Sequence, residues 1–234
     1  ANGHMSAYSM AYCRRDLIVF TLMAFGDIHE YVHPLAALEQ PLRQADVIVV
    51  TGDMTRWRGP ETAAKVLEAI AQYNPSLLAQ VGNTDTWETH HYLNECGINL
   101  HGQGHTVGPL GIFGAGGSNF TPFYTPTEFS EDDIAATLRC GYDMVRDAPY
   151  KILIAHCPPF RTAVDRIYDG THVGSTSVRR FIEMYQPDLC ISGHIHEAPG
   201  EDRLAPRPLP RHVAVLGHLA PALASGQCRP VRHA

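Results

Sequence analysis

The sequence has little that would support a disulfide framework, a basic surface or a membrane span. Its six cysteines form no C-x-x-C pair and no disulfide-framework spacing, so we expect reduced thiols and a cytoplasmic protein. The net charge of −6 argues against an extended nucleic acid or an anionic membrane as a partner. An apolar run at residues 17–25 is too short to span a bilayer and lacks a small-residue cleavage site, so we do not interpret it as an anchor or signal peptide.

Several catalytic motifs are also absent. There is no G-x-S-x-G, which removes the serine-hydrolase alternative. The glycine-rich run at 114–119 lacks G-K-[ST] and does not match G-x-G-x-x-G at the start of a helix, so we reject a nucleotide-binding loop. Cys157 follows His156 directly, but this imidazole is better used as a metal ligand than as the base of a thiol nucleophile.

The composition supports a single folded domain. The chain has 234 residues, of which 44% are hydrophobic, enough for a full core. We interpret residues 1–5 as a cloning remnant and residues 11–234 as one domain, because no repeat and no long linker divides the chain. The irregular tail after Pro221 has no pattern that assigns it a role.

Buried strands alternate with amphipathic helices, which predicts an α/β fold with a parallel sheet. Apolar segments predict buried strands at 17–25, 46–51, 77–81, 151–155 and 188–192. Helical spacing of apolar residues, with start signals such as Ser130, predicts helices at 33–44, 61–73, 130–146 and 175–185. Residues 98–113 predict meandering strands, and residues 213–216 a closing strand.

Each of the five predicted strands ends next to a side chain that can bind a metal. The first run is Gly26-Asp27-Ile28-His29, and in an extended segment residues two apart face the same way. The carboxyl ends of parallel strands share one edge of a sheet, so we expect these side chains to meet. A carboxylate together with imidazoles suits a divalent cation. The candidates are Asp27, His29, Asp53, Asn83, His156, His194 and His196.

The order D-x-H, G-D, G-N, a lone His and G-H-x-H resembles the calcineurin-like metallophosphoesterase superfamily, over about residues 17 to 218. The loop at 116–128, the run His156-Cys-Pro-Pro and the segment 170–175 resemble a bacterial and archaeal branch related to cyclic-nucleotide-type phosphodiesterases. The resemblance implies a four-layer αββα sandwich with two divalent metal ions at the strand ends. Manganese is the first expectation, with iron, zinc or nickel as alternatives.

The resemblance also implies roles for the seven residues. The first metal would be held by Asp27, His29 and His196. The second would be held by Asn83, His156 and His194, and Asp53 would bridge both. The implied catalytic residues are Asp53, Asn83 and His156, which hold the metals around a bridging hydroxide that attacks the phosphorus. We therefore expect Asp53 to lie within a few ångströms of both imidazole groups.

One position departs from the family pattern. The family usually reads G-N-H-[DE], and its His is thought to protonate the leaving oxygen, whereas Thr84 stands there in this chain. A threonine hydroxyl cannot act as a general acid near neutral pH, so alkyl esters should turn over slowly unless another donor replaces it. The candidate donors are His33, His90, His91 and His172, none of them favoured, and each is better explained as a solvent-exposed histidine.

The 116–128 loop carries Phe120, Phe123 and Tyr124. These side chains either stack on a base or aromatic leaving group, or pack a proline-rich loop onto the domain. The leading hypothesis is a metal-dependent phosphoesterase acting on a small substrate, a phosphodiester rather than a monoester. The alternatives are a catalytically weak or inactive scaffold of the same fold and, weakest, a nuclease, since no basic stripe is present. Substrate, native metals and oligomeric state stay open.

Overall fold

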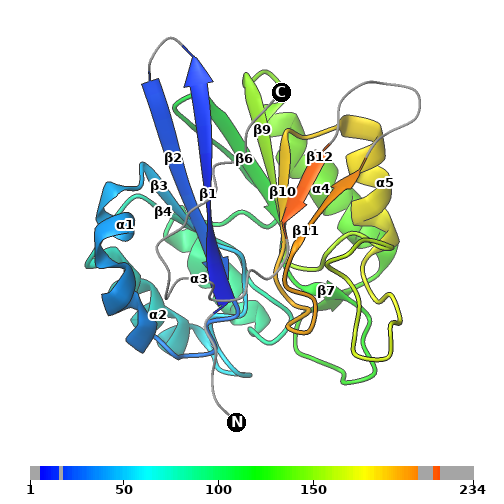
Figure 1. The fold of residues 1–234 in the computed structure, drawn as a ribbon. Coiled ribbons are helices and arrows are strands. Elements are labelled where there is room, and N and C mark those ends of the chain that lie inside the picture. The colour runs from blue at the N-terminus through cyan, green and yellow to red at the C-terminus, as the bar shows by residue number, and fades with distance from the viewer. Residues whose placement is uncertain (1–5, 16–17, 205–212, 217–234) are drawn as a thin grey trace.

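The computed structural model describes residues 6–15, 18–204 and 213–216. Figure 1 shows two β-sheets packed face to face, with helices on both outer faces. The first sheet has the order β1 (Ser6–Arg15), β2 (Ile18–Gly26), β3 (Val47–Val50) and β4 (Leu77–Ala79). The second has the order β11 (Glu201–Leu204), β12 (Val213–Leu216), β10 (Leu189–Ile191), β9 (Tyr150–Ala155), β6 (Leu110–Ala115) and β5 (Gly104–Val107). Two short strands, β7 (Ser118–Asn119) and β8 (Glu128–Phe129), pair separately.

The helices form the two outer layers. The first sheet is covered by η1 (His33–Leu38), α1 (Glu39–Gln44), α2 (Pro60–Ala71) and α3 (Trp87–Glu95), and the second by α4 (Glu131–Val145) and α5 (Thr176–Tyr185). Local sequence sets the starts: Pro60 occupies the first turn of α2 after Gly59, and the Ser130 hydroxyl accepts from the Asp133 N–H at 3.1 Å. None of the described helices has the length and apolar character needed to cross a membrane.

The core has three layers, which establish the four-layer αββα sandwich. Alternate residues of each strand face opposite ways, so Met23 and Phe25 pack under the helices of the first sheet while Leu22 and Ala24 face the second sheet. The inter-sheet layer is aliphatic, with contributions from β2, β3 and β4 on one side and from β6, β9 and β10 on the other. A third layer lies between the second sheet and α4 and α5.

The parallel strands of both sheets end at the same edge. In the first sheet β2, β3 and β4 are parallel, and in the second so are β6, β9, β10 and β12. The register continues past the strands, because the Asp27 N–H donates to the Gly52 carbonyl at 3.0 Å and the His29 N–H to the Asp53 carbonyl at 2.9 Å. The segments that follow β2 and β3 therefore leave the sheet side by side.

Five elements were not predicted: β1, α3, β11 and the two-residue strands β7 and β8. The first strand is β1, not the 17–25 segment, and it pairs antiparallel with β2. The longest continuous apolar run in residues 6–15 is the short one at 10–13. Helix α3 buries only Thr89 and Leu93, so its sequence lacks the apolar stripe that would predict a helix. Strand β11 has the sequence Glu-Asp-Arg-Leu, which has three charged residues and no apolar alternation. The predicted 33–44 helix is split into η1 and α1. The proposed cloning remnant and the tail after Pro221 lie outside the described residues.

Candidate metal centre

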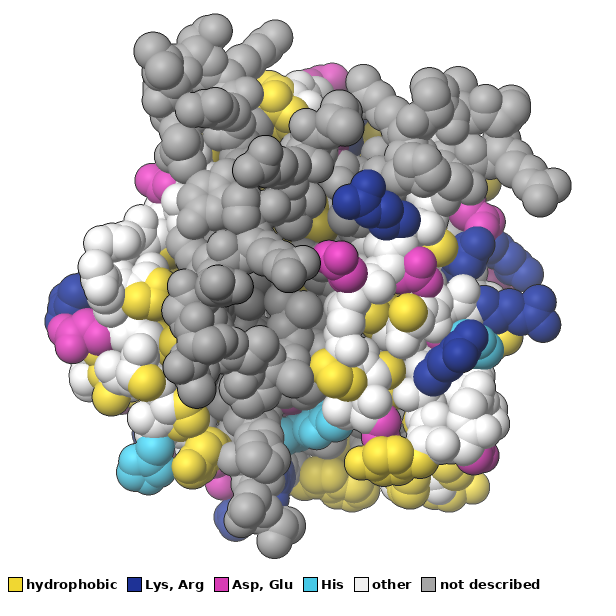
Figure 2. Space-filling view, viewed as in Figure 1, with side chains coloured by type: hydrophobic (Ala, Val, Ile, Leu, Met, Phe, Trp, Pro, Cys, Tyr) yellow, Lys and Arg dark blue, Asp and Glu magenta, His cyan; other side chains and the backbone are white. Residues whose placement is uncertain are grey.

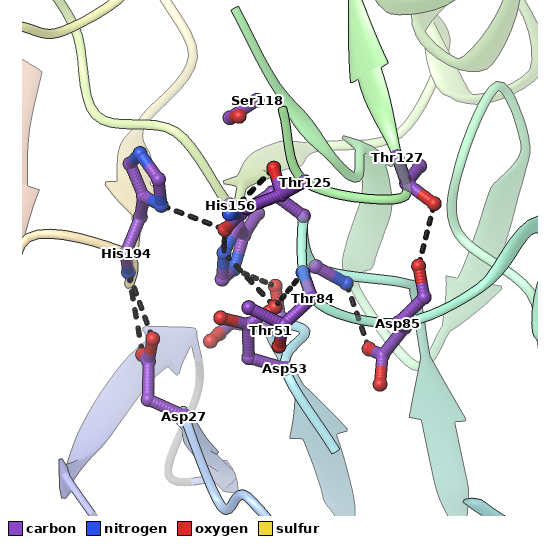
Figure 3. A network of polar contacts seen from close by, with 12 residues as sticks. Asp27, Thr51, Asp53, Thr84, Asp85, Ser118, Thr125, Thr127, His156 and His194 are labelled. Atoms are coloured by element: carbon purple, nitrogen blue, oxygen red, sulfur yellow. Dashed lines mark hydrogen bonds and ion pairs between the residues drawn. The ribbon is translucent and has the colours of Figure 1, made fainter. Parts of the chain in front are cut away.

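The seven predicted side chains come together where the two sheets meet. Figure 3 shows Asp27, Asp53, His156 and His194 pointing toward a common centre from four different strand ends. Asp27, Asp53, Asn83 and His156 are buried, and His29 and His194 are half-buried, while His196 is exposed. The centre is therefore walled by protein and open to solvent on the His196 side.

Asp27, His29 and His196 form one group, with donor atoms all within 4.8 Å of one another. His196 Nε2 lies 3.1 Å from Asp27 Oδ1, and the two imidazole ring centroids are 5.4 Å apart. The predicted convergence is present, although its cause differs from the one expected. Asp27 and His29 have φ angles of 52° and 47°, so a left-handed turn brings them together, not extended backbone.

Asp53 lies between this group and the next. Its Oδ2 is 3.8 Å from His29 Nε2, and its Oδ1 is 3.5 Å from His156 Nε2. The Thr84 N–H donates to the same Oδ1 at 2.8 Å and fixes the carboxylate. One carboxylate therefore faces both imidazole groups, as a bridging ligand would.

The second group centres on the Asn83 amide oxygen. This Oδ1 lies 3.1 Å from His156 Nε2 and 2.8 Å from His194 Nδ1. The amide nitrogen points the other way and donates to the Thr125 hydroxyl at 3.0 Å. Asp27, Asp53 and His156 also offer donor atoms within 4.8 Å of one another. The carboxylates of Asp27 and Asp53 therefore lie close to both groups.

Four of the seven candidate ligands, Asp27, Asp53, Asn83 and His194, directly follow a glycine, and backbone conformation and close packing explain these glycines. Asp53 and His194 have φ angles of 53° and 71°, which L-residues adopt at a cost and which cluster at functional sites. Gly52 has φ 124°, and a side chain there would lie 2.7 Å from the Gly82 backbone. A Cβ on Gly82 would overlap the Asp53 carboxylate. The strand ends meet too closely for any larger residue.

The electrostatics of the centre favour positive charge. Burial opposes protonation of His156, but attraction to and hydrogen bonding with Asp53, helped by Asp27, raise its pKa to about 9. Burial lowers the pKa of His194 to about 4, and repulsion from His156 acts in the same direction. Burial opposes ionisation of Asp53, yet attraction to His156 holds the pKa of this carboxyl below its usual range. The Asp53 carboxyl thus stays ionised among imidazoles, as a ligand of a cation must.

The donor set itself fits divalent metal ions. Two carboxylates, four imidazoles and one amide oxygen combine hard oxygen with imidazole nitrogen, a mixture that suits first-row transition metals. Cys96, Cys140, Cys157 and Cys190 carry free thiols and are not part of this donor set.

Asp85 is a supporting residue that sequence analysis did not single out. Its buried carboxylate accepts from the N–H groups of Met54, Thr55 and Gly82 at 3.2, 2.8 and 2.9 Å, and from the Thr55 hydroxyl at 2.9 Å. Burial and the charge of Asp53 raise its pKa to about 7. This clamp joins the segments after β3 and β4, which carry Asp53 and Asn83. The acidic position that ends the family's G-N-H-[DE] pattern was the available signal.

Thr125 and Glu128 are a second support that was missed. The Thr125 hydroxyl accepts from Asn83 Nδ2 and donates to Glu128 Oε1 at 2.6 Å. Glu128 also accepts from the backbone N–H groups of Thr121 and Thr125 at 3.1 and 2.8 Å. The 121–128 loop is thereby closed on itself and linked to Asn83. No spacing in the sequence indicates this, because the partners meet through a loop.

The Thr84 side chain is committed elsewhere: its hydroxyl donates to the Thr55 carbonyl at 2.7 Å. The histidines considered as replacement acids have partners of their own. His90 stacks on Trp87 with ring centroids 4.0 Å apart. His172 Nδ1 lies 2.6 Å from Asp165 Oδ1, and its Nε2 accepts from Arg166 at 3.3 Å. His91 contacts Trp87 edge-on, and His33 contacts Tyr31.

Comparison with known proteins identifies the family of this chain. A family model for calcineurin-like phosphoesterases matches residues 20–198. Uncharacterized protein MJ1162 of Methanocaldococcus jannaschii is 34% identical over 189 residues, 78% of this chain and 83% of that protein. The crystal structure of TT1561 of Thermus thermophilus is 16% identical, with a TM-score of 0.60 over 85% of this chain and 88% of that one. A putative 5′-nucleotidase from Staphylococcus aureus is 15% identical, with a TM-score of 0.50 over 84% of this chain and 48% of that one. The two structures are similar to this chain in fold.

Proposed function

Because the chain belongs to the calcineurin-like phosphoesterase family, we propose that it is a metal-dependent hydrolase of small phosphodiesters. The observation that supports this is the meeting of seven ligand-competent side chains from five strand ends of two sheets, with Asp53 facing both imidazole groups at 3.8 and 3.5 Å. We assign Asp27, His29 and His196 to one divalent ion, Asn83, His156 and His194 to a second, and Asp53 to both. Manganese is the first candidate, with iron, zinc and nickel as alternatives.

Two divalent ions, when bound, would supply Lewis acidity toward the phosphoryl oxygens and lower the pKa of a water nucleophile. The rest of the chemistry belongs to the protein. Thr84 holds Asp53 through its backbone N–H, and Thr125 holds Asn83 through its hydroxyl. Both interactions fix candidate metal ligands in place, which is what the partners of metal ligands generally do.

The leaving oxygen has no proton donor at the Thr84 position, because that hydroxyl donates to the Thr55 carbonyl. A general acid contributes about 10²–10⁴-fold for a poor leaving group and little for a phenol-like one. The enzyme should therefore act best on esters whose alcohol leaves as a stable anion. The choice of a diester follows the resemblance of the 116–128 loop to cyclic-nucleotide-type phosphodiesterases.

The test is hydrolysis of bis(p-nitrophenyl) phosphate by dialysed protein reloaded with Mn²⁺. We expect turnover above a metal-only control, faster than on p-nitrophenyl phosphate, and loss of turnover in Asp53→Asn. No hydrolysis above the metal control would overturn the proposal. An inactive scaffold is the alternative, and the complete ligand set opposes it; elemental analysis with less than one metal per chain would favour it. Cytoplasmic location and the absence of a polynucleotide partner stay predictions from composition.

A further inference from the structure

We propose that Trp57 and Tyr124 form a subsite that binds a planar aromatic group of the phosphoester substrate. This inference rests on the proposed function and adds a substrate class to it. The two residues lie on different loops, the first after β3 and the second between β7 and β8.

Both side chains are large, apolar and held in solvent. Trp57 is 57% exposed and Tyr124 is 86% exposed. Figure 2 shows hydrophobic side chains gathered along the lower edge of the molecule, the end toward which β2 points in Figure 1. Apolar surface left in water beside a catalytic centre is a common mark of a binding site.

Both residues also have a backbone conformation that bulky side chains rarely adopt. Their φ angles are 58° and 53°, in the left-handed region that Gly, Asn and Asp tolerate best. Both side chains remain more than half exposed, so packing alone accounts poorly for the strain. Such strain persists where neighbouring structure imposes it, and it clusters at ligand-binding positions.

The hydrogen bonds that hold the backbone near Trp57 and Tyr124 lead to two consecutive residues, Asn83 and Thr84. The Trp57 N–H donates to the Thr84 carbonyl at 2.8 Å. Tyr124 directly precedes Thr125, whose hydroxyl accepts from Asn83, and the Glu128 carboxylate holds the Thr125 N–H at 2.8 Å. The aromatic residues are therefore each one short link away from Asn83 and Thr84. This places the backbones of both residues next to the segment that carries Asn83, a candidate metal ligand.

The chemistry of the leaving group agrees with an aromatic substrate. Without an acid at Thr84 the centre favours an alcohol that leaves as a stabilised anion, and aryl alcohols do. Indole and phenol rings stack on aryl groups and nucleobases alike, because each presents a π-face. The chain's net charge of −6 disfavours the other use of exposed aromatics, contact with an anionic membrane.

The test compares phenylphosphonate with methylphosphonate as inhibitors of Mn²⁺-loaded protein. Neither is hydrolysed, and they differ by the ring alone. Stacking on one aromatic residue typically changes affinity by about tenfold. We expect the wild type to bind phenylphosphonate at least about tenfold more tightly, and Trp57→Ala and Tyr124→Ala each to bring the ratio of inhibition constants toward one. Trp57→Phe and Tyr124→Phe keep a ring and should keep most of the preference.

Tyr168→Ala is the matched control: Tyr168 is 92% exposed and lies in a loop whose described backbone bonds, Gly170 to Ile167 and Ile167 to Thr171, are internal. It should retain the wild-type ratio. Equal inhibition of the wild type by both phosphonates, or an unchanged ratio in both alanine variants, would overturn the aromatic subsite while leaving the phosphoesterase proposal intact. Failure of methylphosphonate to bind the wild type at all would count against the phosphoesterase centre itself, and the subsite would fall with it.

Discussion

Thr125→Val should weaken metal binding without removing a single ligand. Asn83 is buried, with 5% of its surface exposed, and its amide nitrogen has the Thr125 hydroxyl as acceptor at 3.0 Å. Valine keeps the shape and deletes the oxygen. A buried donor left without an acceptor costs about 1–3 kcal/mol. The amide can recover part of this by rotating, which would turn Nδ2 toward His156 and His194 in place of Oδ1.

The expected size follows from related cases. Loss of a residue that orients a metal ligand typically costs about 10–100-fold in metal affinity. We therefore expect the Mn²⁺ dissociation constant of Thr125→Val to be about 10- to 100-fold larger than that of the wild type, as measured by calorimetric titration of the demetallated protein. Thr125→Ser retains the hydroxyl and should bind nearly as tightly as the wild type.

Thr121→Val is the matched control for this experiment. Thr121 donates its N–H and its hydroxyl to the same Glu128 carboxylate, so its replacement weakens the loop closure to a similar degree. Its described hydrogen bonds do not include Asn83. If Thr125→Val and Thr121→Val bind Mn²⁺ equally well, the effect belongs to loop closure and the orientation of Asn83 by Thr125 is refuted.

Four further predictions concern bound metal, Thr84, Glu131 and Trp57. Chelation of a metal-loaded sample should lower the melting temperature, because a ligand at 100 times its dissociation constant stabilises the folded state by about 2.7 kcal/mol; an unchanged melting curve would show that no bound metal contributes. Thr84→His should raise turnover of alkyl diesters relative to aryl diesters, and an unchanged ratio would mean that the missing imidazole does not limit the reaction. Glu131 is partly buried, which alone would raise its pKa, but hydrogen bonds from Ser175, Ser177 and Thr176 hold that pKa below its usual range; its stabilisation should be present above the unfolded pKa and lost as pH falls through the folded one, so Glu131→Gln should lower stability at pH 7 and flatten the acid side of a denaturation profile. Trp57→Gly should relieve about 1–2 kcal/mol of left-handed strain at a cost of about 0.5–1 kcal/mol of chain entropy, so urea denaturation should show little or no loss of stability despite removal of an indole.

The sequence predicts those parts of the molecule that local chemistry determines. The strands before Asp27, Asp53 and His156 are continuous apolar runs followed by glycine or a polar residue, a pattern that marks both the strand and the ligand that follows. Thr125, Glu128 and Asp85 were missed because their role depends on partners that lie up to 42 positions away. Strand β1 was missed because its position depends on pairing with β2, and the short apolar run at 10–13 does not by itself identify a strand.

The left-handed turn that joins Asp27 to His29 shows that the two-residue period of a strand can predict the right side-chain placement from the wrong backbone conformation. An extended segment would also have placed the two side chains on one face, so the correct convergence was obtained from the wrong backbone. Only the hydrogen bonds from Asp27 and His29 to the chain after β3, at 3.0 and 2.9 Å, determine the true conformation. Those bonds join segments that are about two dozen residues apart, beyond the range of any local propensity.

The inter-sheet layer is made of leucine, isoleucine, valine and alanine, whose contacts with one another are non-directional. The candidate ligands come from both sides of this seam: Asp53 and Asn83 follow strands of one sheet, and His156 and His194 follow strands of the other. A bound cation would thus fasten the two halves together at one end, much as a cross-link does in secreted proteins. Stripped of metal, the chain would open first along that seam, and amide hydrogens near the ends of β3 and β9 would exchange before those at the opposite end.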